Sequence, residues 1–146
     1  MHSDRIADLL PHAGRMRLID RVTAHDDEHI VCEADSHRAA DHPLAIDGVL
    51  PAVCGLEYGA QAMAIHGALA ARRNGEWGDR PRVGFVVAAH DLSWSVARLD
   101  TLPAPLVIEA RCEFGGANQV SYTFEVRAGD RSVVRGRASV VLSAAA

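Results

Sequence analysis

The chain has 146 residues, of which 49% are hydrophobic and 23% charged, and this length and composition predict one ordinary globular domain over residues 1–146. A formal net charge of −4 and an aromatic content of 5% offer neither a basic surface nor a stacking platform, which excludes nucleic-acid binding as a predicted function. The absence of lysine excludes Schiff-base chemistry and a P-loop, and charged or polar residues interrupt every apolar stretch that could cross a membrane.

The cysteines show no functional pattern, and the first residues indicate the cellular compartment. Cys32, Cys54 and Cys112 are widely spaced and form neither a CxxC motif nor a zinc pattern, so we interpret them as small buried hydrophobic residues. The N-terminal sequence MHSDRIADLL lacks the basic-then-apolar pattern of a signal peptide. We therefore expect a cytoplasmic protein.

The first third of the chain predicts a short helix followed by two strands. Ser3–Leu10 has a serine N-cap and an apolar face, and a proline follows it. Met16–Thr23 and Glu28–Ser36 alternate in the manner of β-strands, and the charged residues between them indicate a hairpin. Residues 36–51 show little periodicity, and a loop of this length is often functional.

The rest of the chain predicts one long helix and then four strands. Val53–Arg73 follows a proline, is almost entirely apolar, and ends at Asn74-Gly75. The four predicted strands are Arg82–Trp94, Pro105–Gly115, Gln119–Arg127 and Ser132–Leu142. Because strands and helices do not alternate, the order predicts an α+β fold in which an antiparallel six-stranded sheet wraps around one long central helix.

This sheet is expected to need a partner. One helix cannot cover a six-stranded sheet, and the strand sequence VGFVVAAH (83–90) is apolar on both faces. We therefore predict a homodimer with extended sheets, or a dimer of dimers.

Candidate catalytic residues cluster around the start of the helix. Glu57 is the one acid among small and apolar residues there, and the partial desolvation expected for its carboxyl suits a general acid. His42 lies in the preceding loop, and Gln61 follows Glu57 by one helical turn. From these residues alone, His42 could instead cap the loop, Glu57 could face solvent, and Gln61 could hydrogen-bond loop backbone. His37 and Asp41 beside His42 lack a further ligand, so neither a metal nor another cofactor is predicted.

Two motifs give this chain a family resemblance. The segment LLPHAGRMRLIDRV (residues 9–22) is similar to the opening "LPHR…LVDRV" of the β-hydroxyacyl-acyl-carrier-protein dehydratases, which have the hotdog fold. The central motif of that family runs His-Phe-Pro-Gly, Pro-Gly, an acid, and Gln four residues later; His42, Pro51, Glu57 and Gln61 take the corresponding places. The helix sequence LPAVCGLEYGAQAMAIHGAL resembles the aryl-polyene-type dehydratase branch more closely still.

The chain also departs from the common pattern of that family at three points. The motif HFPG is replaced by HPLA at residues 42–45, and Ala52 stands where the family has glycine. His42 also precedes Glu57 by one residue more than the fourteen that separate the two residues in common dehydratases.

The resemblance implies dehydration of 3-hydroxyacyl-acyl-carrier-protein thioesters to trans-2-enoyl thioesters, in fatty-acid or polyene-type biosynthesis. His42 would remove the C2 proton and Glu57 would protonate the departing C3 hydroxyl. Backbone N–H groups of Ala52 and Val53 would stabilise the developing enolate, and Gln61 would orient Glu57.

The resemblance also implies partners. In the family, the histidine and the acid of one site come from different subunits, so activity would require a dimer. The phosphopantetheine arm of the carrier protein would need a basic entrance, for which the candidates are Arg72, Arg73, Arg80, Arg82 and Arg98.

Two other functions remain open at this point. Hotdog thioesterases also carry an acid on the central helix, but they use it to direct water at the thioester carbonyl and need no histidine base. The HPLA loop and Ala52 are compatible with a third function, a catalytically inactive partner subunit that keeps the fold.

Overall fold

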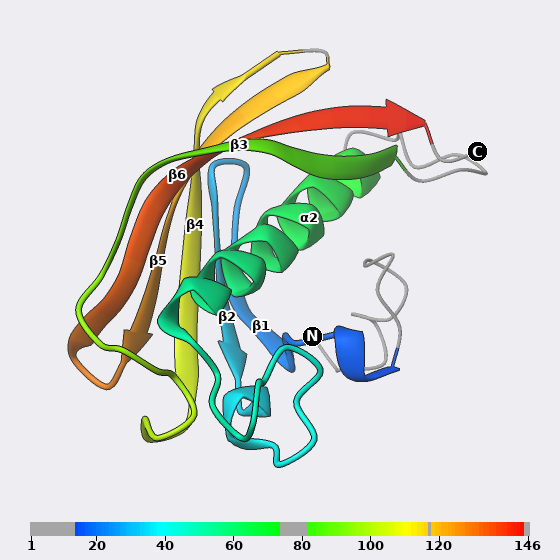
Figure 1. Cartoon of the computed structure of the whole chain (residues 1–146). Helices are drawn as coiled ribbons and strands as arrows, with labels where there is room; N and C mark the ends of the chain where they lie inside the picture. The colour runs from blue at the N-terminus through cyan, green and yellow to red at the C-terminus, as the bar shows by residue number, and fades with distance from the viewer. Residues whose placement is uncertain (1–13, 74–81, 117, 145–146) are drawn as a thin grey trace.

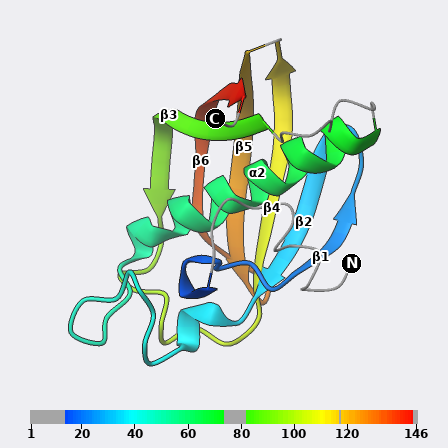
Figure 2. The same cartoon turned by 90° about the vertical axis from the view of Figure 1, so that its right-hand side faces the viewer.

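One long helix lies against a single curved sheet in the computed structural model of the chain, which describes residues 14–73, 82–116 and 118–144 (Figure 1). The elements, in chain order, are η1 (Gly14–Met16), β1 (Arg21–His25), β2 (His29–Ala34), η2 (Ser36–Arg38), η3 (Ala52–Cys54), α2 (Gly55–Arg73), β3 (Arg82–Trp94), β4 (Leu106–Gly115), β5 (Gln119–Ala128) and β6 (Arg131–Ala144). Figure 2 shows α2 crossing the strands on one face of the sheet.

The sheet has six strands in the order β1-β2-β4-β5-β6-β3, and every neighbouring pair is antiparallel. The predicted α+β class and the antiparallel sheet around a central helix are therefore confirmed. Although β3 directly follows the helix in the sequence, it lies at the sheet edge beside β6. The segment after β3 consequently crosses to β4 and passes the start of the helix on its way.

The first strand begins later than its alternating pattern predicted. Strand β1 starts at Arg21 rather than Met16, because residues 14–16 form the 3-10 turn η1 and the backbone of Leu18 bonds to side chains. The Leu18 N–H donates to Gln61 Oε1 at 2.8 Å, and the Leu18 carbonyl accepts from Ser36 Oγ at 2.7 Å. The predicted helix Ser3–Leu10 lies outside the described residues.

Helix α2 packs on the sheet through one stripe of side chains. Tyr58, Ala62, Ile65 and Leu69 follow one another at helical spacing and are buried in the core. The approach is close near the start of the helix, since a Cβ added to Gly59 would lie 2.6 Å from Cδ2 of the β5 residue Phe124.

The opposite stripe of the helix consists of small and apolar residues that are only half-buried, namely Leu56, Ala60, Ala64 and Gly67. Among the described helices, none is long and apolar enough to cross a membrane. All three cysteines are free thiols; Cys32 is buried, whereas Cys54 and Cys112 are only half-buried, so the expected burial holds fully for one of them.

Candidate functional site

The start of the central helix is held in place by the segment that follows β3. The Leu99 N–H donates to the Leu50 carbonyl at 2.8 Å, and the Leu50 N–H donates to Asp100 Oδ1 at 2.9 Å. Arg98 also donates to the Asp100 carboxylate, and this hydrogen bond holds the pKa of Asp100 well below its usual range. The loop that leads into the helix is therefore anchored by a carboxylate that stays ionised.

The segment that follows β3 also engages one of the two backbone N–H groups predicted to stabilise an enolate. The Ala52 N–H donates to the Ala97 carbonyl at 3.1 Å, so the expectation that it is available to a substrate is wrong for this arrangement. Val53 lies in the same 3-10 turn, η3, and is 44% exposed. Of the predicted pair, Val53 is thus left as the candidate donor to an oxyanion at the helix start.

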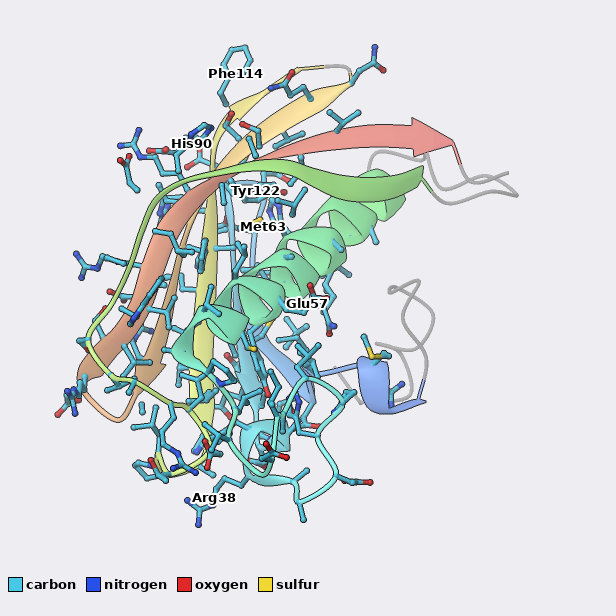
Figure 3. All side chains as sticks on the ribbon, viewed as in Figure 1. Arg38, Glu57, Met63, His90, Phe114 and Tyr122 are labelled. Carbon is cyan, nitrogen blue, oxygen red and sulfur yellow. The ribbon has the colours of Figure 1, made fainter. Side chains whose placement is uncertain are left out.

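Glu57 lies in the first turn of α2 and is half-buried (Figure 3). Its Oε1 accepts a hydrogen bond from Gln61 Nε2 at 3.3 Å. Gln61 is completely buried; its Nε2 also donates to the Met16 carbonyl at 2.7 Å, while its Oε1 accepts from Leu18. Gln61 therefore both contacts Glu57 and fixes the segment around residues 16–18, which combines the two roles that the sequence left open.

His42 is 6% exposed, and both of its ring nitrogens are engaged within the chain. Nδ1 lies 3.0 Å from the Leu44 N–H, in the turn that contains the HPLA sequence. Nε2 lies 3.1 Å from the hydroxyl of Tyr58, the residue directly after Glu57. Because a backbone N–H can only donate, Nδ1 is the acceptor, and the proton of the neutral ring is on Nε2.

Tyr58 connects His42 to the first of the 3-10 turns in the loop. Its hydroxyl lies 2.7 Å from Ser36 Oγ, and Ser36 Oγ donates to the Leu18 carbonyl. Tyr58 itself is completely buried, and burial raises the pKa of its hydroxyl. The loop histidine is thus joined to the first turn of the helix beside Glu57.

The surroundings keep His42 neutral. Burial is the main cause that lowers its pKa, and His37 lowers it further, whereas Asp41 opposes the shift. His37 is completely buried and donates from Nε2 to the Leu102 carbonyl at 3.1 Å, and burial lowers its pKa as well. Within residues 14–73, 82–116 and 118–144, no group of three acidic, histidine or cysteine side chains could hold a metal ion.

The sequence did not single out Tyr58 or Ser36. The available signal was a phenol next to the only acid of an apolar helix, because a buried tyrosine hydroxyl needs a hydrogen-bond partner. Of the arginines predicted to receive a carrier protein, Arg98 is paired with Asp100. Arg80 and the side chains of Arg72, Arg73 and Arg82 lie outside the described residues.

Comparison with protein families gives one match that spans nearly the whole chain. The ApeP-like family, described as ApeP dehydratase, matches residues 4–145. No curated protein matches the sequence.

Solved structures share the fold at low sequence identity. The dehydratase heterocomplex ApeI:P from Xenorhabdus doucetiae superposes with a TM-score of 0.82 at 22% identity, covering 98% of this chain and 91% of that one. A mutant thioesterase from Pseudomonas aeruginosa has a TM-score of 0.65 at 11% identity, covering 99% and 96% of the two chains. AziG from S. sahachiroi has a TM-score of 0.59 at 22% identity, covering 94% and 99%. These similarities confirm the predicted hotdog fold.

Proposed function

Since this chain belongs to the ApeP-like family of dehydratases, we propose that it removes water from 3-hydroxyacyl thioesters carried on an acyl carrier protein, in fatty-acid or polyene-type biosynthesis. One observation carries the proposal. The Tyr58 hydroxyl contacts the buried imidazole of His42, and Gln61 contacts the half-buried carboxyl of Glu57, so each chain holds a candidate base and a candidate acid in fixed positions.

The proposed reaction breaks the C2–H and C3–O bonds of the substrate and forms a C2=C3 double bond. His42 accepts the C2 proton on the ring nitrogen that becomes free when the hydrogen bond from the Leu44 N–H breaks. The carboxylic acid of Glu57 gives its proton to the C3 hydroxyl, which leaves as water. Charge that develops on the thioester oxygen is stabilised by the Val53 N–H at the positive end of the helix. Gln61 keeps the Glu57 carboxyl in position through its contact with Oε1.

A second copy of the chain is part of this proposal. The edge strand β3 has exposed apolar side chains at Val86 and Trp94, and the outward stripe of α2 is apolar and half-buried. Pairing of β3 with the same strand of a second copy would cover both features and abolish an exposed sheet edge. In this homodimer, each site combines His42 of one chain with Glu57 of the other.

A non-catalytic partner subunit is a second candidate function. To accept a proton at Nε2, His42 must first carry its own proton on Nδ1, which requires loss of the hydrogen bond from Leu44. The engaged N–H of Ala52 favours this candidate too. The structure from Xenorhabdus doucetiae is itself a dehydratase heterocomplex, which supports the idea of a supporting subunit.

The test is an assay of the purified protein with 3-hydroxyacyl and trans-2-enoyl thioesters of an acyl carrier protein, followed by mass spectrometry. Interconversion that is lost in both His42→Ala and Glu57→Gln would support the dehydratase. His25→Ala and Glu113→Gln, which change exposed residues on the sheet, are the matched controls and should retain full activity.

The other outcomes of the assay identify the competing functions. Release of free acid would replace the proposal by the thioesterase function, to which the similarity with the Pseudomonas aeruginosa thioesterase lends support. No turnover of any chain length, by a protein that nevertheless raises the activity of a separate dehydratase subunit, would establish the non-catalytic partner.

A further inference from the structure

We propose that Tyr58, oriented by Ser36, is a positioning residue whose phenol oxygen accepts a hydrogen bond from Nε2–H of His42 and stabilises the imidazolium form of that ring. This inference rests on the proposed function for the importance of His42, but the contacts that support it lie within one chain.

The Leu18 carbonyl, at one end of this series of hydrogen bonds, determines the direction in which each of them runs. The Leu18 carbonyl can only accept, so the single hydroxyl proton of Ser36 points to it across 2.7 Å. Ser36 Oγ is therefore left as an acceptor for Tyr58, whose hydroxyl lies 2.7 Å away. Since the proton of Tyr58 is then directed to Ser36, the phenol oxygen presents a lone pair to Nε2 of His42.

At the other end of this series of hydrogen bonds, the Leu44 N–H independently requires the same directions. The Leu44 N–H donates to Nδ1 of His42, which places the ring proton on Nε2, opposite the lone pair of Tyr58. Every donor between Leu44 and Leu18 then faces an acceptor. Reversing the tautomer would set the Nδ1 proton against the Leu44 N–H and would leave the Tyr58 oxygen without the donor from His42.

Burial makes these contacts hard to replace by water. Tyr58 is completely buried and His42 is 6% exposed, so a lost partner leaves a polar atom in an apolar environment. The other titratable groups that act on His42 are His37 and Asp41, both in the same loop. Of the groups that contact the ring, Tyr58 is the one that comes from the helix bearing Glu57.

The experiment is ¹⁵N NMR of the free, full-length protein, in which long-range proton–nitrogen couplings identify the protonated nitrogen of each histidine ring and follow its titration. The expected wild-type result is a neutral His42 with its proton on Nε2. Tyr58→Phe keeps the ring but removes the acceptor, and it should lower the titration midpoint of His42 by about one pH unit because imidazolium loses a charge-assisted hydrogen bond.

Ser36→Ala and Tyr122→Phe complete the set of variants. Ser36→Ala should lower the midpoint by less than Tyr58→Phe, because the phenol oxygen remains but is no longer polarised by Ser36. Tyr122→Phe removes a hydroxyl from another histidine–tyrosine pair on the same helix and should leave His42 unchanged. A tyrosine that only fills space would also leave the midpoint unchanged in Tyr58→Phe.

Two results would overturn the inference. One is a wild-type His42 with its proton on Nδ1, which can be seen without any variant. The other is an unaltered midpoint in a folded Tyr58→Phe. Neither measurement involves substrate, so failure of the inference can be distinguished from failure of the dehydratase proposal.

Discussion

Two buried histidine–tyrosine pairs are attached to the same helix, and their hydrogen bonds run in opposite directions. In the loop-side pair, Nε2 of His42 donates to Tyr58. In the sheet-side pair, Nε2 of His66 lies 2.9 Å from the Asp26 carbonyl, and Nδ1 lies 2.7 Å from the hydroxyl of the β5 residue Tyr122. Because that carbonyl can only accept, the proton of a neutral His66 ring is on Nε2, and Tyr122 then donates to Nδ1.

In each pair, the backbone group that contacts the other ring nitrogen determines whether the tyrosine hydroxyl donates or accepts the hydrogen bond. An N–H group at Leu44 makes Tyr58 an acceptor, whereas a carbonyl at Asp26 makes Tyr122 a donor. The sheet-side pair joins the β1–β2 turn to the helix and the sheet, so its role is structural. The loop-side pair lies next to Glu57, where the state of the imidazole matters for chemistry.

The largest expected effect comes from a change at a close contact between the helix and the sheet, next to Tyr58. Gly59 follows Tyr58 and faces Phe124, and a Cβ there would lie 2.6 Å from the Phe124 ring. Gly59→Val should lower the free energy of unfolding by about 3 kcal/mol, since the buried ring must shift. Gly67→Val is the matched control, because a Cβ at Gly67 meets nothing within 4 Å. Equal losses in the two variants, measured by urea unfolding, would contradict this view of the helix–sheet contact.

Breaking the sheet-side pair alone should reduce stability but not activity. Tyr122→Phe leaves Nδ1 of the buried His66 without its donor, and the expected loss is about 1–3 kcal/mol in the free energy of unfolding. Turnover per folded molecule should equal that of the wild type at a temperature where both are folded. Loss of turnover in Tyr122→Phe without unfolding would show that the two pairs do not have separate roles.

Acidification should affect the loop side through His37 and His42. Both have folded-state pKa values below the ordinary histidine value, so over mildly acidic pH the unfolded chain binds more protons than the folded one. Stability from these residues is fully present above about pH 6.5 and falls as pH is lowered, by at most about 1.4 kcal/mol per pH unit for each group. His37→Gln should reduce this slope in urea unfolding measured between about pH 7 and pH 5. An unchanged slope would exclude His37 as a contributor.

The smallest effect is expected for a polar contact on the outer face of the sheet. Arg135 Nη2 donates to Glu125 Oε2 at 3.1 Å, but the arginine side chain is 63% exposed. Solvent screens such a pair, and Arg135→Ala should change the free energy of unfolding by less than about 1 kcal/mol. A loss as large as that of Tyr122→Phe would remove the contrast between buried and exposed polar contacts.

Much of the fold could be predicted from local patterns. Alternation and turn residues place strand β3 at Arg82–Trp94, as observed, and apolar composition predicts the central helix. The start of β1 was missed because Leu18 bonds to Gln61 and Ser36, which are far away in the sequence. Periodicity carries no information on such side-chain-to-backbone bonds.

Candidate site residues could be proposed from the sequence, but most of the contacts that connect them could not. His42, Glu57 and Gln61 could be proposed from a motif, and the Gln61–Glu57 contact follows from helical spacing. The engagement of the Ala52 N–H could not be predicted, because its acceptor, Ala97, lies in an irregular segment after β3. The link through Tyr58 depends on three segments that meet only in the folded chain.

The most direct test of the proposed site mixes two inactive variants, His42→Ala and Glu57→Gln, by joint refolding or co-expression. If each site combines His42 of one chain with Glu57 of the other, half of the dimers are mixed and one of their two sites is intact, so about a quarter of the wild-type dehydration rate should return. Native mass spectrometry would verify that mixed dimers have formed. Mixed dimers without recovered dehydration, from variants of an active wild type, would contradict a site shared between His42 and Glu57 of two chains.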